Sequence, residues 1–337
     1  MSGDPELGVG VDVGGTKLLG VVLGAAGDGQ EERAEIVCEE RRETPGAGES
    51  LPDEVASLVR SLLATAGAAD SVEVAVGVGV PGLVDRDGVL HFSPNLPAAG
   101  GSPVRSRLSD LFGDGRPVYV DNDAACAAAG ECTYGAGRGR DDVLFVTLGT
   151  GIGGGIVSGG RLLRGAGNLA GEIGHLVVDP AGPPCGCGRR GCWERYASGS
   201  GLGRLARDAV LAGSASRVLE IAGGDPGCVR GEHVVAAAAG GDAEAEAILA
   251  EHASWVALGL ANLVNVLDPE LIVIGGGLAG AGEAFFAPLR RALADQVEGS
   301  QVRPPIGLVP AELGDRAGAI GAAVLGRRAA SSRARHG

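Results

Sequence analysis

Apolar and polar positions alternate in blocks along the chain, and two of these blocks are alike. The first has an apolar run over Leu7–Val13, a break at Gly14–Gly15 and a second apolar run over Leu18–Leu23. Two short apolar runs joined by a glycine turn are typical of a buried β-hairpin. The arrangement recurs from Val143 to Val157, around a glycine-rich turn at Leu148–Gly155. Two halves that open in the same way predict a duplicated α/β architecture.

Further elements follow from the same patterns. Apolar runs of strand length occur at Val72–Val78, Val118–Val120 and Leu271–Ile274. Helical periodicity covers longer segments, one of which stops where a proline follows. The expected helices are Pro52–Ala66, Ala124–Tyr134, Ala243–Leu267, Glu283–Ala294 and Ala317–Arg328.

The size and charge of the chain limit the classes of function. A length of 337 residues is long for one hydrophobic core, and about two domains are expected. A net charge of −14 argues against nucleic acid as a partner, because phosphate binding needs a basic face. No apolar run approaches the roughly 20 residues that cross a bilayer, and the N-terminal MSGDPELG lacks the layout of a signal peptide. We therefore expect a soluble, cytoplasmic protein that binds no membrane.

A cluster of metal-binding residue types lies in Glu172–Glu194, EIGHLVVDPAGPPCGCGRRGCWE. It contains His175, Cys185, Cys187 and Cys192. One imidazole and three thiols close a tetrahedral Zn²⁺ site, and the glycines between them permit the tight turns that the spacing requires. A disulfide or three free thiols are the alternatives, but close cysteines in a reducing compartment are more often metal ligands. The glutamates at both ends indicate a loop that presents polar groups to a ligand.

The other four cysteines have no such partners in the sequence. Because cysteine outside a metal site behaves as a small apolar residue, we expect these side chains to be buried. They are Cys38, Cys126, Cys132 and Cys228.

The first glycine turn carries groups that suit a phosphate. Asp12 ends the first apolar run, and Gly14, Gly15 and Thr16 make the turn. The N–H groups of a glycine turn can face phosphate oxygens, and an aspartate at a strand end can hold Mg²⁺ directly or through water. The turn is not a Walker A loop, and an ordinary hairpin turn is the alternative. The next residue, Lys17, is the only lysine of the chain.

The second turn, LGTGIGGG, also satisfies the pattern GxGxxG through Gly149, Gly151 and Gly154. A dinucleotide-binding turn would continue into a helix and meet an acidic residue about 20 residues later. Here Ile156 and Val157 stand among glycines and indicate a returning strand. We expect a second phosphate-binding hairpin, with a dinucleotide turn as the alternative.

Two more motifs follow predicted strands. Gly275–Gly277 precedes a helix, where bare backbone lets a flat ring or a phosphate approach, although a plain connection would look similar. Asp121-Asn122-Asp123 also precedes a helix. One aspartate there can be a simple cap, but two can hold vicinal hydroxyls and leave one carboxylate free to accept a proton. Turns at Pro81-Gly82 and Ser93-Pro94-Asn95 have polar tips as well.

In this order, the motifs resemble those of the ROK family of sugar kinases, especially its bacterial glucokinases. DVGGTK (Asp12–Lys17) and LGTGIGGG (Leu148–Gly155) resemble its two phosphate motifs, and IGGGL (Ile274–Leu278) resembles its adenosine motif. The resemblance runs from about Leu7 to Leu325, and its zinc loop and the order of its phosphate motifs are specific. The remaining matches are GEIGH (Gly171–His175) to the family signature, CGCGRRGCWE (Cys185–Glu194) to the zinc loop and GDRAGAIGAA (Gly314–Ala323) to a late helix.

The resemblance implies an α/β fold that is two-lobed, actin-like and ribonuclease-H-like, with ATP and sugar in an interlobe cleft. Residues 1–122 would form the small lobe, on which a helix over 316–330 packs back. Residues 123–315 would form the large lobe with the zinc loop, 172–194. The implied cofactors are a structural Zn²⁺ and Mg²⁺ bound with ATP, and family analogy implies a homo-oligomer, a dimer or tetramer.

The resemblance also implies the roles of individual residues. Asp123 would be the general base that accepts the proton of the sugar hydroxyl, Asp12 would lie near Mg²⁺, and His175 would bind zinc through one ring nitrogen while it faces the sugar. The implied sugar contacts are Gly82, Asn95, Asn122, Asp123, Glu172, His175 and Glu194. The implied nucleotide and phosphate contacts are Asp12, Gly14, Gly15, Thr16, Lys17, Gly149, Thr150, Gly151, Gly275, Gly276 and Gly277. The implied zinc ligands are His175, Cys185, Cys187 and Cys192.

The expected activity is ATP-dependent phosphorylation of a hexose, with glucose 6-phosphate as the product from glucose. The family usually has Glu-Asn-Asp-Ala-Asn at the base motif, whereas this chain has Asp121 at its start and Ala125 at its end. The base is kept but the sugar contacts differ, so N-acylmannosamine, fructose, allose or a cyclitol is an alternative acceptor. A sugar-sensing regulator would need a helix-turn-helix, and only about eleven residues precede Asp12. A dinucleotide-dependent oxidoreductase would leave the zinc loop and the second hairpin unexplained.

Overall fold

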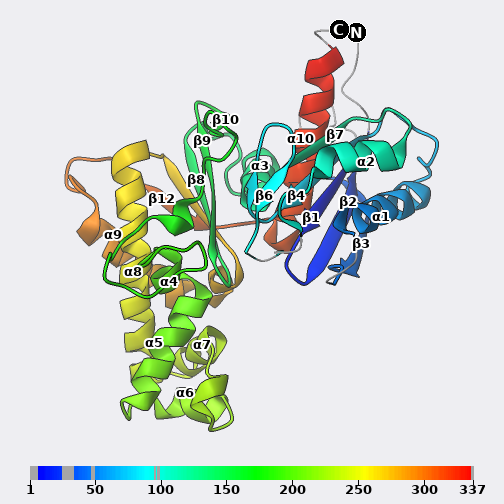
Figure 1. Cartoon of the computed structure of the whole chain (residues 1–337). Coiled ribbons are helices and arrows are strands. Elements are labelled where there is room, and N and C mark those ends of the chain that lie inside the picture. The colour runs from blue at the N-terminus through cyan, green and yellow to red at the C-terminus, as the bar shows by residue number, and fades with distance from the viewer. Residues whose placement is uncertain (1–6, 25–33, 47–49, 95, 97–98, 335–337) are drawn as a thin grey trace. The chain divides into compact units, whose positions relative to one another are not determined.

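The structure is a computed structural model that describes residues 7–24, 34–46, 50–94, 96 and 99–334 (Figure 1). The chain divides into two compact units. Unit 1 comprises residues 1–145, 155–171 and 312–337, and unit 2 comprises residues 146–154 and 172–311.

Unit 1 is built on a five-stranded sheet with the strand order β3-β2-β1-β4-β7. β1 pairs antiparallel with β2, as the first apolar block predicts, and parallel with β4, which pairs parallel with β7. The strands are β1 (Gly8–Val13), β2 (Lys17–Leu23), β3 (Ile36–Glu43), β4 (Ala75–Val80) and β7 (Val118–Asn122), with a separate hairpin of β5 (Leu83–Val84) and β6 (Leu90–Phe92). The helices are α1 (Leu51–Thr65), α2 (Val104–Phe112), α3 (Asp123–Tyr134), the 3-10 helix η5 (Gly314–Arg316) and α10 (Ala317–Ala334).

One face of this sheet is apolar and packs against α1. Val9 and Val11 point to the same face because strand side chains alternate, and they are buried in one core with Leu58 of α1. Ser50 caps this helix with its hydroxyl, and Pro52 stands in the first turn, where its missing N–H is not needed. The local sequence therefore fixes where α1 begins, and its buried face fixes where it packs.

The opposite face of the sheet carries glycines and lies against α10. A Cβ at Gly10 would lie 1.9 Å from the carbonyl oxygen of Ala319, and a Cβ at Gly77 would lie 1.8 Å from that of Ala322. No other residue type leaves room for a helix this close to the strands. On its other side, α10 touches the backbone of α3, where a Cβ at Gly321 would lie 1.7 Å from the carbonyl oxygen of Cys126. Helix α10 therefore fixes both the sheet and α3.

The second sheet has the strand order β10-β9-β8-β11-β12, and the boundary between the units runs through β8 and β9. Its strands are β8 (Val143–Leu148), β9 (Ile152–Ser158), β10 (Arg161–Leu162), β11 (Leu271–Gly275) and β12 (Gly307–Pro310). The α-helices of unit 2 are α4 (Glu194–Ala197), α5 (Gly199–Leu211), α6 (Ser216–Ile221), α7 (Gly231–Ala239), α8 (Ala243–Leu267) and α9 (Glu283–Gln296). Its 3-10 helices are η2 (Ile173–His175), η3 (Pro226–Cys228) and η4 (Gly277–Ala281).

Helix α8 forms the core of unit 2. It is capped by the side chain of Asp242, and Gly259 on its buried face receives the ring of Trp193, which a Cβ there would meet at 2.0 Å. By length and composition this helix could cross a membrane, which corrects the expectation that no apolar run approaches that length. However, 61% of its most apolar window is buried inside the protein, as in a core helix.

The predicted elements are largely present, and the differences have local causes. Helix α8 has the predicted bounds, whereas β4 covers Ala75–Val80 instead of Val72–Val78. The sequence did not predict β3, α2, α5, α6 or α7. Helix α3 packs against α10 and belongs to unit 1, while the boundary between residues 122 and 123 that the resemblance implies stays a prediction.

Candidate active site

The polar motif at the end of β7 is organised by the start of α3. Asn122 Oδ1 accepts a hydrogen bond from the N–H of Ala125 at 3.0 Å, and its Nδ2 donates to the carbonyl of Gly82 at 3.2 Å. Asp123 is the first residue of the helix, and its Oδ1 accepts from the N–H of Ala124 at 2.8 Å. Burial raises the pKa of Asp123 above the usual value for an aspartate. A carboxylate with a raised pKa is a better proton acceptor when ionised, which suits a general base.

Asp121, the first residue of the motif, has a structural role. Only 1% of its surface is exposed, and Arg164 forms an ion pair with its Oδ2 at 2.5 Å. The hydroxyl of Tyr119 donates to the same oxygen at 2.6 Å, and Asn168 Nδ2 donates to Oδ1 at 3.3 Å. Asp121 therefore ties the segment that carries Arg164 and Asn168 to β7. Of the two aspartates in the motif, Asp123 is the one suited to accept a proton from a substrate.

Asp12 lies near the end of β1, against the first turn of α10. A Cβ at Gly318 would lie 2.5 Å from the carboxyl carbon of Asp12, so the carboxylate reaches this place only beside a glycine. Burial raises the pKa of Asp12 to about 8, and the charges of Asp123 and Asp315 add to the rise. A divalent cation would favour the ionised form of such a carboxylate, so the residues present fit the expected Mg²⁺.

The first glycine turn is supported from the end of β3. Within the turn, Gly14 N–H donates to the carbonyl of Lys17 at 2.8 Å. The hydroxyl of Thr44 donates to the carbonyl of Gly14 at 2.7 Å, and its N–H donates to the carbonyl of Thr16 at 3.0 Å. Gly15, Thr16 and Lys17 are exposed. These hydrogen bonds therefore fix the backbone of the turn, and its predicted phosphate contacts Gly15, Thr16 and Lys17 face solvent.

The second glycine turn leads into a strand. Gly149 N–H donates to the carbonyl of Gly151 at 3.0 Å, and Gly199 N–H at the start of α5 donates to the carbonyl of Gly149 at 2.8 Å. Thr150 at the tip is exposed, and β9 begins at Ile152. Because a dinucleotide-binding turn continues into a helix, this alternative is wrong.

The three glycines predicted to bind adenosine have different roles. Gly275 is buried at the end of β11. Gly276 has a φ of 83°, and a Cβ there would lie 2.5 Å from the carbonyl oxygen of Leu148. Only Gly277, at the start of η4, lines a cavity. The first two glycines are therefore packed against neighbouring backbone and the third lines the cavity, while a nucleotide contact by each of them stays a prediction.

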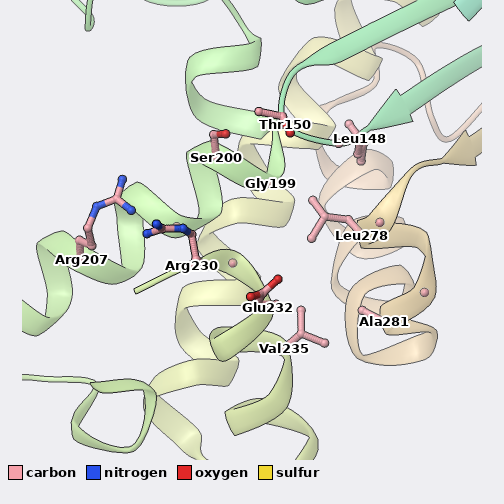
Figure 2. Close-up of a pocket in the computed structure, with 15 residues that line it drawn as sticks. Leu148, Thr150, Gly199, Ser200, Arg207, Arg230, Glu232, Val235, Leu278 and Ala281 are labelled. Carbon is pink, nitrogen blue, oxygen red and sulfur yellow. The ribbon is translucent and has the colours of Figure 1, made fainter. Parts of the chain in front are cut away.

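That cavity, of about 760 Å³, lies within unit 2 (Figure 2). Its lining comes from the second glycine turn, from α5, from the first turns of α7 and from η4. Most of these residues belong to no motif of the sequence, because helices distant in sequence meet here. The only local signal was the Gly-Ser-Gly at the start of α5. The missed residues include Ser200, Arg207, Arg230, Glu232 and Val235.

The four predicted metal ligands come together in unit 2. One ligand atom from each of His175, Cys185, Cys187 and Cys192 lies within 4.8 Å of all the others. The Sγ atoms of Cys187 and Cys192 are 3.5 Å apart, and Cys185 Sγ is 3.7 Å from His175 Nδ1. Donors at bonds of about 2.0–2.3 Å around a tetrahedral Zn²⁺ are separated by similar distances. The sulfur atoms of the three cysteines are not bonded to one another, and the donor set fits zinc.

Two glutamates stand beside this cluster. Cys185 Sγ donates to Glu194 Oε1 at 2.9 Å. The other oxygen of Glu194 faces the second glycine turn, where a Cβ at Gly151 would meet it at 2.8 Å. Glu172 Oε2 is 3.9 Å from His175 Nε2, on the side of the ring away from the thiols. His175 can therefore bind a metal through Nδ1 and present Nε2 to another group.

The predictions that remain concern Asn95 and the four cysteines outside the metal cluster. Asn95 lies outside the described residues. Cys126 is buried and Cys38 and Cys132 are half-buried, but Cys228 is exposed. The expectation of burial is therefore wrong for Cys228, which lies in η3 at the surface. An isolated thiol in a polar, glycine-containing segment gave no local signal of packing.

Comparison with known proteins gives one consistent result. The sequence profile of the ROK family matches residues 8–329. A glucokinase of Streptomyces coelicolor is 38% identical over 325 residues, which is 95% of this chain and 98% of that protein. An N-acetylmannosamine kinase of Escherichia coli is 34% identical over 321 residues, which is 94% of this chain and 96% of that protein.

Solved structures agree with the sequence relatives. A ROK family glucokinase from Streptomyces griseus, in complex with glucose and AMPPNP, has a TM-score of 0.80 and 38% identity, over 96% of this chain and 99% of that one. A ROK hexokinase from Thermus thermophilus has a TM-score of 0.75 and 34% identity, over 98% of this chain and all of that one (100%). The predicted fold class, a two-domain α/β sugar kinase, is confirmed.

Proposed function

The chain belongs to the ROK family, and on this premise we propose that it transfers the γ-phosphoryl group of ATP to a hexose, converting glucose to glucose 6-phosphate. The observation that carries the proposal is the 38% identity to a glucokinase over nearly the whole of both chains. The placement of Asp123 at the start of α3 supports it, because the helix holds the carboxylate on its first turn. The sequence identity and the position of the Asp123 carboxylate therefore support the same reaction.

We assign the proton transfer to Asp123. As the sugar oxygen attacks the γ-phosphorus, its O–H bond breaks and the proton passes to the Asp123 carboxylate, while the bond between the γ-phosphorus and the bridging oxygen of ADP breaks. A positioned base contributes typically about 10²–10⁴-fold to such a step. Asn122 supports the base because its side chain caps α3 and holds the carbonyl of Gly82.

The phosphate-binding groups are the two glycine turns. Their N–H groups, together with the exposed Thr16 and Thr150, would orient the phosphates of ATP. Lys17 offers a cation beside the first turn. Mg²⁺ bound with ATP near Asp12 would neutralise charge on the transferring group, which is the main requirement of phosphoryl transfer.

The proposed sugar contacts form two groups in the sequence. The first group belongs to the base motif and the turns that the resemblance adds to it, with Gly82, Asn95, Asn122 and Asp123. The second group is Glu172, His175 and Glu194, whose loop a structural Zn²⁺ would hold through His175 Nδ1 and the three thiolates. The ring of His175 would then face the sugar from the side of Nε2, where Glu172 also stands.

N-acetylmannosamine is the second candidate acceptor, because a kinase for that sugar is 34% identical over nearly the same length. The mechanism would be unchanged, and only the hydroxyl contacts would differ. We further propose that the protein is cytoplasmic, where ATP is available and thiols stay reduced, and that it forms a dimer or tetramer.

A coupled assay of ATP turnover over a panel of sugars tests the proposal. We expect glucose to give the highest kcat/KM, and N-acylmannosamine, fructose, allose and a cyclitol to give lower values. A higher kcat/KM for any of these would move the assignment to that acceptor. No turnover with any sugar would refute the kinase proposal, and a second donor, polyphosphate, checks the assignment of ATP.

A further inference from the structure

The cavity of unit 2 contains charged side chains that no sequence motif accounts for. Arg207 Nη1 donates to the carbonyl of Val229 at 2.9 Å. Arg230 Nη1 donates to the carbonyls of Gly227 and Val229 at 3.1 and 3.2 Å. Both guanidinium groups are therefore held by backbone at one end of the cavity, where they help to shape it (Figure 2).

Glu232 is the third charged residue, and it is not held in this way. Its side chain is 80% exposed, and within the described part of the chain the basic group that faces it is the ring of His233, whose Nε2 is 3.8 Å from Glu232 Oε1. That distance is too long for a hydrogen bond. Glu232 lies in the first turn of α7, where the helix dipole favours a negative charge. An ionised carboxylate with both oxygens available can accept two hydrogen bonds.

The wall near Glu232 is apolar. Val235, Leu278 and Ala281 line it, and Figure 2 shows Glu232 between this wall and Arg230. Glu232 and Val235 are three residues apart on α7, so they are neighbours on one face of the helix. A flat ring that packs on Val235 would place an attached sugar within reach of the carboxylate. The tip of the second glycine turn, at Thr150, lines the same cavity.

We propose that Glu232 accepts hydrogen bonds from the vicinal ribose hydroxyls of the nucleoside triphosphate and thereby selects ribonucleotides over 2′-deoxyribonucleotides. The inference rests on the proposed kinase function, because it takes the cavity as the place of the nucleoside. Two adjacent hydroxyl donors match the two oxygens of a carboxylate, as in the acidic residue that binds ribose at dinucleotide sites. Glu232 is thus a specificity-determining residue at the end of the donor where no chemistry occurs.

The test combines removal of the carboxylate with removal of the hydroxyl. We would measure kcat/KM for ATP and 2′-deoxyATP at saturating glucose, in the parent protein and in Glu232→Ala. Hydrogen bonds to charged groups are strong enough that the parent should prefer ATP by roughly tenfold to hundredfold. In Glu232→Ala the ratio should fall to near one, because ATP loses its advantage while 2′-deoxyATP is little changed. The KM for glucose should stay the same.

Matched controls separate this role from general damage. Glu246 is an exposed acidic residue in the first turn of α8, and Glu246→Ala should keep the parent ratio. If Glu232→Ala keeps the ratio, or weakens both nucleotides equally, the proposal is overturned. Purine riboside triphosphate, which lacks the amino group of adenine, gives a further arm. If Glu232→Ala abolishes discrimination against this nucleotide instead, the carboxylate binds the base and the proposal is wrong.

Binding measurements distinguish failure of this inference from failure of the proposed function. If no sugar is phosphorylated, the kinase assignment fails, but calorimetry with ADP and 2′-deoxyADP still reports on Glu232. Tighter binding of ADP that Glu232→Ala abolishes would support the role of Glu232 even then. Equal binding of the two nucleotides by the parent protein would overturn it.

Discussion

The base motif and the metal loop are both candidates for sugar binding, yet they are ordered in different ways. Asp123 stands where the buried strand β7 passes into α3, and the capping bonds of the helix hold its neighbours. The loop of residues 172–194 has only the short helix η2 and the isolated bridges Val177–Cys192 and Pro184–Arg190. Regular backbone orders the first region, whereas side chains that share a metal would order the second.

This difference indicates which of the two regions keeps its geometry without a bound metal. The base motif should keep its geometry in any folded state of unit 1, because strand and helix are part of the core. The metal loop has fewer supports of its own, such as the hydroxyl of Tyr196, which donates to Asp179 Oδ2 at 2.6 Å. Loss of Asp123 should therefore lower turnover without loss of metal, and damage to the metal loop should affect metal and sugar binding together.

The largest effect is expected from Asp123→Ala. Loss of the base should lower kcat by about 10²–10⁴-fold, while zinc content remains and sugar binding, which keeps its other proposed contacts, falls much less. Steady-state kinetics with metal analysis checks this separation, and Asp123→Asn, which keeps the shape of the side chain, should behave alike. A kcat near that of the parent would remove Asp123 from the role of base.

Cys187→Ala tests the other region. With one of four ligands removed, zinc should fall from about one per chain to near zero, and the KM for sugar should rise by roughly tenfold or more as the loop loosens. Cys228→Ala is the matched control, because that thiol is exposed and lies outside the cluster. Equal zinc in Cys187→Ala and the parent, by elemental analysis, would refute the metal site.

Asp121→Asn sharpens the comparison within the base motif. The change removes the charge that pairs with Arg164, whose side chain is 21% exposed, so we expect a loss of about 2 kcal/mol in the free energy of unfolding. Denaturant unfolding measures this loss. The proton acceptor is untouched, so kcat at saturating sugar should change much less than in Asp123→Ala. A fall in kcat as large as that of Asp123→Ala, with unchanged stability, would show that Asp121 takes part in the chemistry and would contradict its structural role.

The smallest effect is expected from a buried histidine in α8. His252 Nε2 donates to the carbonyl of Ser198, and burial lowers the pKa of His252 to about 4. In the unfolded chain this histidine is protonated below about pH 6.5, whereas in the folded protein it is protonated only below about pH 4. Between these two pH values the unfolded state binds more protons, so a lower pH destabilises the folded protein. We expect about 1 kcal/mol less stability at pH 5.5 than at pH 7 from this group.

Unfolding curves at several pH values test this expectation, with His252→Gln as the comparison. Glutamine keeps a donor near Ser198 but does not titrate, so part of the pH dependence should disappear. An unchanged pH dependence in His252→Gln would show that another group is responsible.

The sequence predicted what depends on neighbours in the chain. The metal ligands fall within one short segment and could be recognised directly. The helix α3 was expected one residue late, from Ala124 with an aspartate as its possible cap, whereas it starts at Asp123 and Asn122 caps it. The close resemblance to ROK motifs extended this to the fold. The strands and helices with clear apolar periodicity, such as α8, were found with nearly correct bounds.

Long-range contacts could not be predicted in the same way. Asp121 and Asp123 look alike in sequence, and only the arrival of Arg164 and Asn168 from a later loop separates their roles. Likewise, Arg207, Arg230 and Glu232 meet at a cavity that the second glycine turn, α5, α7 and η4 build together. Exposure of Cys228 also depends on where η3 lies in the folded unit, which composition does not encode.

The close packing of α10 against Gly10 and Gly77 has a consequence for biosynthesis. The strands that it covers are synthesised first, but the helix that completes their packing starts only at Ala317. While the ribosome is still making unit 2, one face of the first sheet therefore lacks its partner and must wait in a partly assembled state. A ribosome stalled before Ala317 would therefore leave this face of the sheet without the helix that covers it.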